Sequence, residues 1–179
     1  MARGGVVARE AVLTNPTMSD GPDGRLVLLA AEIRGEGQQI GKCVADMPAA
    51  VTALAVPVPR TLEIYGAAAL LDSFYSGIEK ALERIAKSFG VLPAGAGWHR
   101  DLLESSCLDL PGLRPAILDP RCARELEEYL GIRQSFRHLY IFDLEPGRLR
   151  PLLIDAPAVW HTTEAALLAF ADRVTAWSN

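Results

Sequence analysis

The sequence predicts an all-α fold, an antiparallel, up-and-down bundle of four or five helices, from three observations. Apolar residues recur at steps of three and four over long segments, which is the period of an amphipathic helix. Strand-like alternation of apolar and polar residues is nearly absent. Clusters of proline and glycine divide the chain between the periodic segments. The 179 residues, half of them hydrophobic, fit one domain with a substantial core.

The N-terminal end differs in composition from the rest of the chain. Residues 1–24 are rich in glycine, proline and small polar residues and show no sustained period. We expect them to form a poorly ordered tail, followed by one helical domain over residues 25–179. A first helix is expected from Arg25 to Val44, and Pro48 and the Pro57-Val58-Pro59 run are expected to separate it from the next helix.

The strongest helical pattern covers Thr61 to Phe89. Its apolar stripe comprises Ile64, Ala67, Leu71, Phe74, Ile78, Leu82, Ile85 and Phe89. Such a continuous stripe predicts a helix that packs against the core. The charged residues between these positions, Glu79 among them, are expected to face solvent or a partner.

Two shorter helices are expected in the middle of the chain. Trp98 opens the first, which continues to about Ser106, and we expect Trp98 to cover the core and His99 to be a hydrogen-bonded structural residue. Asp119-Pro120 starts the second, because Asp accepts hydrogen bonds from free amides and Pro favours the first helical position. Helical spacing continues from there to Arg137.

The last helix is expected from Ala158 to Trp177. An element also starts near Glu145-Pro146 by the same reasoning, but Pro151 and Pro157 are expected to interrupt the chain before the final helix begins.

Composition restricts the class of protein. The net charge of −4 argues against a protein that coats nucleic acid. The three cysteines form no C-x-x-C pair and no metal-ligand spacing, and a reducing cytoplasm is the expected location. No apolar run is long enough to cross a membrane. We expect a soluble cytoplasmic protein without metal or cofactor.

Residues suited to phosphate chemistry gather in the stretch from Gly131 to Tyr140. Guanidinium groups match phosphate oxygens, and a histidine titrates near neutral pH. At about 100° per residue, Arg133 and Arg137 share a helix face while His138 lies about 140° from Arg133. Either the helix turns near His138, or two copies of the stretch meet across a symmetric dimer. The structural alternative is that these groups only oppose the negative end of the helix dipole.

Arg133, His138 and Tyr140, in this order and spacing, resemble the R-x4-H-x-Y motif of the HEPN superfamily, specifically the HepT-like ribonuclease toxins of bacterial toxin–antitoxin pairs. This resemblance implies a helical bundle, usually a homodimer, that acts as a metal-independent endoribonuclease with the motif assembled at the dimer interface. His138 would act as general base or acid, Arg133 would stabilise charge on the phosphate, and Arg137 would contact phosphate. A nucleotidyltransferase antitoxin would neutralise the toxin by adding adenylate to Tyr140.

The likeness covers roughly residues 60–177 and includes Leu71 to Glu79, Glu83 to Ala86 and Trp98 to Leu103. The residue after the motif arginine departs from the family pattern, with Gln134 where Asn, Asp or His is common. Gln provides a polar contact but neither a charge nor a base. Two alternatives therefore stand beside the enzyme: a non-catalytic binding module that engages a nucleotidyltransferase, with Tyr140 as the modification site, and a helical protein whose motif residues only pack.

Overall fold

The computed structural model describes residues 23–136 and 144–178, and within these ranges the chain is entirely helical apart from its connections. The helices are α1 (Gly24–Ala53), α2 (Thr61–Ser88), α3 (Trp98–Ser106), α4 (Pro120–Phe136) and α5 (Pro146–Trp177). No strand occurs in the described residues, where the β-pairing is a single isolated bridge between Leu110 and Arg114. The predicted all-α bundle is confirmed.

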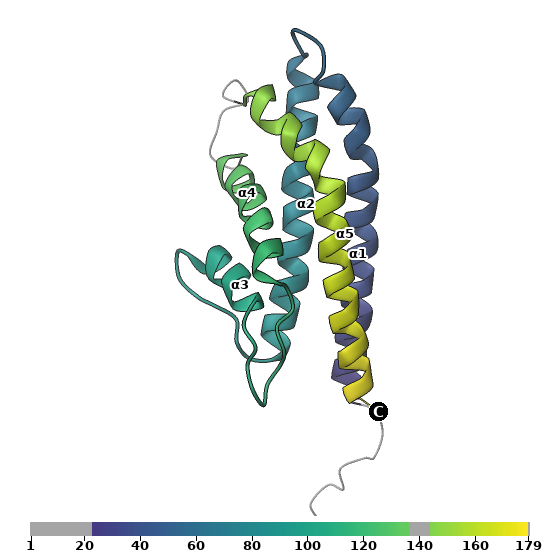
Figure 1. The fold of residues 1–179 in the computed structure, drawn as a ribbon, viewed down its shortest axis with the longest axis vertical. Coiled ribbons are helices and arrows are strands. Elements are labelled where there is room, and N and C mark those ends of the chain that lie inside the picture. The colour runs from purple at the N-terminus through teal and green to yellow at the C-terminus, as the bar shows by residue number, and fades with distance from the viewer. Residues whose placement is uncertain (1–22, 137–143, 179) are drawn as a thin grey trace, which may run out of the picture.

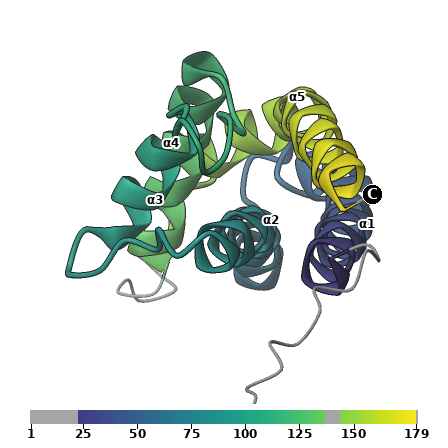
Figure 2. The ribbon, with the colours of Figure 1, turned by 90° about the horizontal axis from the view of Figure 1, so that it is seen from below.

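Three long helices and two shorter ones build the bundle. Figure 1 shows α1, α2 and α5 running up and down along the long axis, with α3 and α4 on the other side of α2. The end-on view in Figure 2 places α2 between α1 and the α3–α4 pair. Helix α2 is therefore the central element, and it packs against each of the other four helices.

Aromatic rings join three of these helices in the core. Phe74 of α2 lies edge-on to Tyr129 of α4, with ring centroids 5.0 Å apart, and to Trp160 of α5 at 6.4 Å. Helix α2 also approaches α1 closely, since a Cβ added to Gly77 would lie 2.6 Å from Cγ1 of Ile40. The close contact requires glycine at this position.

Local signals set several helix boundaries where the sequence predicts them. Helix α2 begins at Thr61, and α3 spans Trp98 to Ser106 as expected. The Asp119 carboxylate accepts hydrogen bonds from the amides of Arg121 and Cys122, both at 2.8 Å, and so caps α4. Residues 1–22 of the expected tail lie outside the described residues. Helix α1 begins at Gly24.

The predicted breaks at three prolines are wrong. Helix α1 continues through Pro48 to Ala53, and α5 is one helix that contains both Pro151 and Pro157. A proline inside a helix removes one hydrogen bond and costs about 3 kcal/mol. Each proline has one buried neighbour in the sequence, and the packing of that neighbour offsets part of this cost: Met47 precedes Pro48, Leu152 follows Pro151, and Ala156 precedes Pro157.

None of the helices in the described residues has the length and apolar character needed to cross a membrane.

Candidate functional site

Of the predicted site residues, the structure describes Arg133. This residue lies in the last turn of α4. Arg137, His138 and Tyr140 lie outside the described residues. Gln134 follows Arg133 in α4 and is exposed to solvent.

The side chain of Arg133 is buried between α4 and α2. Only 7% of it is exposed. Its Nη2 lies 2.7 Å from Oε2 of Glu79, and its Nε donates a hydrogen bond to Oγ of Ser76 at 3.2 Å. Glu79 and Ser76 are one turn apart on α2, so a single face of that helix holds the guanidinium at two points.

A third helix completes this cluster through the other oxygen of the same carboxylate. Oε1 of Glu79 pairs with Nδ1 of His99 at the start of α3. The indole of Trp98 stacks on the His99 imidazole, with ring centroids 3.9 Å apart and planes 34° apart. Because a carboxylate only accepts hydrogen bonds, Nδ1 of His99 carries a hydrogen. Glu79 thus bridges an arginine from α4 and a histidine from α3.

The expectation that Glu79 faces solvent or a partner is wrong, since the residue is 5% exposed. Its place on the helix explains the burial. Glu79 follows buried Tyr75 by four residues and precedes buried Leu82 by three, so it lies on the same arc of α2 as these two. A buried carboxylate needs charged or hydrogen-bonding partners, and Arg133 and His99 supply them. The predicted hydrogen bond of His99 is confirmed.

Tyr75 closes one side of the cluster. Its side chain is almost completely buried. Burial raises the pKa of this phenol strongly and the neighbouring Glu79 carboxylate raises it further, while Arg133 acts in the opposite direction. Tyr75 is therefore a neutral hydroxyl at physiological pH and does not serve as a base.

The face of α2 that holds Arg133 continues toward the end of α4. Tyr65 stacks on Phe136, the last residue of α4, with ring centroids 5.2 Å apart. Between Tyr65 and Ser76 on this face lies Asp72, whose Oδ1 is buried and accepts no hydrogen bond from the described residues. This face of α2 thus extends from the ion pair at Arg133 to Phe136, the last described residue before the gap.

Two of the three guanidinium nitrogens of Arg133 are paired. Nε and Nη2 of Arg133 have partners, whereas Nη1 has none among the residues that the structure describes. A guanidinium carries five N–H donors in a rigid plane, so fixing Nε and Nη2 also fixes the direction of Nη1. A group held in this way can stabilise negative charge without reorganising.

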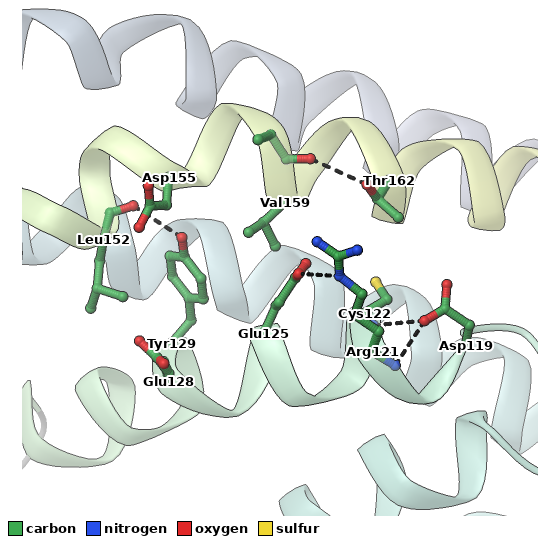
Figure 3. Close-up of a pocket in the computed structure, with 11 residues that line it drawn as sticks. Asp119, Arg121, Cys122, Glu125, Glu128, Tyr129, Leu152, Asp155, Val159 and Thr162 are labelled. Carbon is green, nitrogen blue, oxygen red and sulfur yellow. Dashed lines mark hydrogen bonds and ion pairs between the residues drawn. The ribbon is translucent and has the colours of Figure 1, made fainter.

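A separate cavity of about 480 Å³ lies between α4 and α5 (Figure 3). Its lining comprises Asp119, Arg121, Cys122, Glu125, Glu128, Tyr129, Leu152, Asp155, Ala158, Val159 and Thr162. The carboxylates outnumber the single arginine, which itself pairs with Glu125 at 3.0 Å. This acidic cavity is unfavourable for a phosphodiester and does not include Arg133.

The sequence pattern singled out Arg133 as a candidate but did not predict that Ser76 and Glu79 hold its side chain. The signal for both was their position on α2, one turn apart and beside the apolar stripe.

Comparison with known proteins identifies the family. The sequence model of a family described as HepT-like protein matches residues 66–174, more than half of the chain. The match includes Ser76, Glu79, His99 and Arg133. No curated protein and no solved structure shows significant similarity to the chain.

Proposed function

The chain belongs to the HepT-like family, and from this premise we propose that it is the toxin of a toxin–antitoxin pair and acts as a metal-independent endoribonuclease in the cytoplasm. The observation that carries the proposal is the fixed guanidinium of Arg133 at the end of α4, five residues before His138. An arginine that served only to neutralise a helix end would not need two anchors on a neighbouring helix.

Arg133 supplies the electrostatic part of the reaction. Its Nη1 edge meets a non-bridging phosphate oxygen, where negative charge grows as the 2′-oxygen of the ribose attacks phosphorus. A charged donor that is already oriented stabilises this transition state more than a flexible one, since removing such a donor typically lowers the rate by about 10²-fold to 10³-fold. The pairing with Glu79 keeps the side chain in place before RNA arrives.

His138 supplies the proton transfer. The imidazole takes the proton from the ribose 2′-hydroxyl, and the 2′-oxygen forms a bond to phosphorus while the bond to the 5′-oxygen breaks. The imidazolium then gives the proton to the leaving 5′-oxygen. The products are a 2′,3′-cyclic phosphate and a free 5′-hydroxyl, with no metal in any step. Arg137 contributes a further phosphate contact.

We propose that the site is assembled in a homodimer. The surface beside the end of α4 supports this, since it carries exposed apolar side chains next to the stacked pair of Tyr65 and Phe136. Val58 is 85% exposed and Leu62 is 78% exposed at the junction of α1 and α2. A partner subunit that covers these residues would bring a second motif stretch close to the first.

The experiment that tests the enzyme compares the parent, His138→Ala and His161→Ala on a fluorescent RNA substrate in the presence of EDTA. His161 is an exposed histidine of α5 and is the matched control. We expect the parent and the control variant to cleave RNA equally, and His138→Ala to lose cleavage. Equal cleavage by His138→Ala would contradict the assigned base.

The second candidate function is a binding module that engages a nucleotidyltransferase antitoxin. Exposed Gln134, which has neither a charge nor a basic nitrogen, favours it. Tyr140 would be the acceptor of adenylate. Intact-mass measurement after incubation with the antitoxin and ATP should show the mass of one adenylate on the parent and none on Tyr140→Phe. Modification of a parent protein that does not cleave RNA would favour the binding module.

A further inference from the structure

The carboxylate of Glu79 divides its two oxygens between two helices. Oε2 lies 2.7 Å from Nη2 of Arg133 in α4, and Oε1 pairs with Nδ1 of His99 in α3. The three side chains are almost excluded from solvent, with 7% of Arg133, 6% of Glu79 and 19% of His99 exposed. An arginine and a carboxylate often form two parallel hydrogen bonds. Here the second oxygen of the carboxylate is taken by a histidine instead.

We propose that His99 is a positioning residue for Arg133. By holding Oε1, His99 prevents Glu79 from engaging a second nitrogen of the guanidinium, and it keeps Nη1 available for the substrate phosphate. The inference rests on the proposed ribonuclease function, in which Nη1 contacts that phosphate. His99 itself touches Glu79 and has no contact with the reacting atoms.

The surroundings of His99 suit a fixed hydrogen-bond donor. The Trp98 indole stacks on its ring and restricts the rotation of the imidazole. Ser76 occupies Nε of Arg133, so the one edge of the guanidinium that a freed Oε1 could reach is the Nη1 side. Loss of the histidine would therefore leave a buried oxygen that gains most by moving to Nη1.

Two variants of the full-length chain separate positioning from packing. His99→Leu removes the donor and keeps an apolar side chain of similar bulk. His99→Asn restores a donor, because the amide nitrogen of Asn occupies nearly the position of Nδ1 in His. The first readout is hydrogen exchange at the Arg133 guanidinium, followed by NMR in protein labelled with ¹⁵N-arginine. The signals of Arg133 are assigned by their absence in Arg133→Lys. We expect hydrogen exchange at the Nη positions to slow in His99→Leu, and the parent rate to return in His99→Asn.

The second readout is RNA cleavage. We expect His99→Leu to lower kcat by about tenfold to a hundredfold with KM changed less, and His99→Asn to restore most of kcat. Glu79→Gln weakens the acceptor that competes with the phosphate for Nη1. In a Glu79→Gln background, His99→Leu should therefore lower kcat by a smaller factor than it does in the parent.

Three outcomes separate a failure of the role proposed for His99 from a failure of the proposed ribonuclease function. Unchanged exchange at Arg133 in His99→Leu would overturn the proposal, and so would a kcat of His99→Asn as low as that of His99→Leu at equal thermal stability. A parent chain without ribonuclease activity would refute the proposed function alone, since the exchange measurement on Arg133 would still decide whether His99 controls the guanidinium.

Discussion

The guanidinium of Arg133 and the carboxylate of Glu79 face each other at 2.7 Å across the contact of α4 with α2. The pair connects the last turn of α4 to α2, the central helix of the bundle. Buried ion pairs of this kind add little net stability compared with apolar side chains, because desolvation opposes the attraction. In a core of leucine, isoleucine and alanine, this pair therefore fixes the position of the guanidinium more than it adds to stability.

Breaking this pair should destabilise the protein strongly. Glu79→Ala leaves the Arg133 guanidinium buried without a counter-charge, and we expect the free energy of unfolding to fall by about 3–5 kcal/mol. Urea unfolding followed by circular dichroism measures the change. Glu83→Ala is the control on the same helix, since Glu83 pairs with exposed Lys87 at 2.6 Å, and it should change the free energy by less than about 1 kcal/mol. Equal losses in the two variants would show that leaving the Arg133 guanidinium without its counter-charge carries no special cost.

The contact of α2 with α1 at Gly77 should not accept a side chain. A Cβ in Gly77→Ala would lie 2.6 Å from Cγ1 of Ile40, so the Ile40 side chain or α1 itself must shift, and we expect a loss of about 1–3 kcal/mol. Gly66→Ala on the same helix meets no atom within 4 Å and should stabilise by about 0.5–1 kcal/mol, because Ala is the better helix former. The two melting temperatures measured together test this contrast. A stabilised Gly77→Ala would mean that α1 and α2 are farther apart at this position than the 2.6 Å contact with Ile40 implies.

Local signals predicted most of the fold. The Asp119 cap, the start of α3 at Trp98 and the apolar stripe of α2 depend on residues close in sequence, and the structure has each of them where it was expected. The breaks at Pro48 and Pro151 were wrong because their outcome depends on burial of neighbouring side chains against other helices. Propensity at one residue is overridden when the packing of nearby side chains stabilises the helix.

The candidate site was predictable only in part. Spacing identified Arg133 as part of a motif, but a charged residue such as Glu79 is ordinarily assigned to the surface. Its burial depends on partners that are far away in the sequence, with His99 on α3 and Arg133 on α4. Such pairings become visible only when the packing of the three helices is known.

Alkaline pH should destabilise the protein through Tyr75. Burial and the adjacent Glu79 raise the pKa of this phenol in the folded state above its unfolded value, which is about 10. The folded state therefore keeps the proton more tightly. Its contribution to stability is complete below about pH 10 and is lost as the pH rises from there toward the folded pKa.

Tyr75→Phe removes this titration, so its melting temperature should fall less between pH 9 and pH 11 than that of the parent. Tyr129 is also buried with a raised pKa, which leaves part of the alkaline loss in place. Tyr65→Phe changes a half-exposed tyrosine on the same helix and should follow the parent. Identical pH profiles for the parent and Tyr75→Phe would refute the effect of burial on this residue.

Dimer formation should depend on the apolar surface at the junction of α1 and α2. Leu62 is 78% exposed there, one turn before Tyr65, and a charge at this position would be desolvated if a second subunit covered it. We expect Leu62→Glu to be monomeric in light scattering at concentrations where the parent is a dimer, and to lose ribonuclease activity because the two motif stretches separate. Leu28→Glu is the control, since Leu28 is 59% exposed near the start of α1, at the opposite end of the bundle. A Leu62→Glu protein that remains dimeric and active would place the interface on another face, whereas an active monomer would remove the need for a shared site.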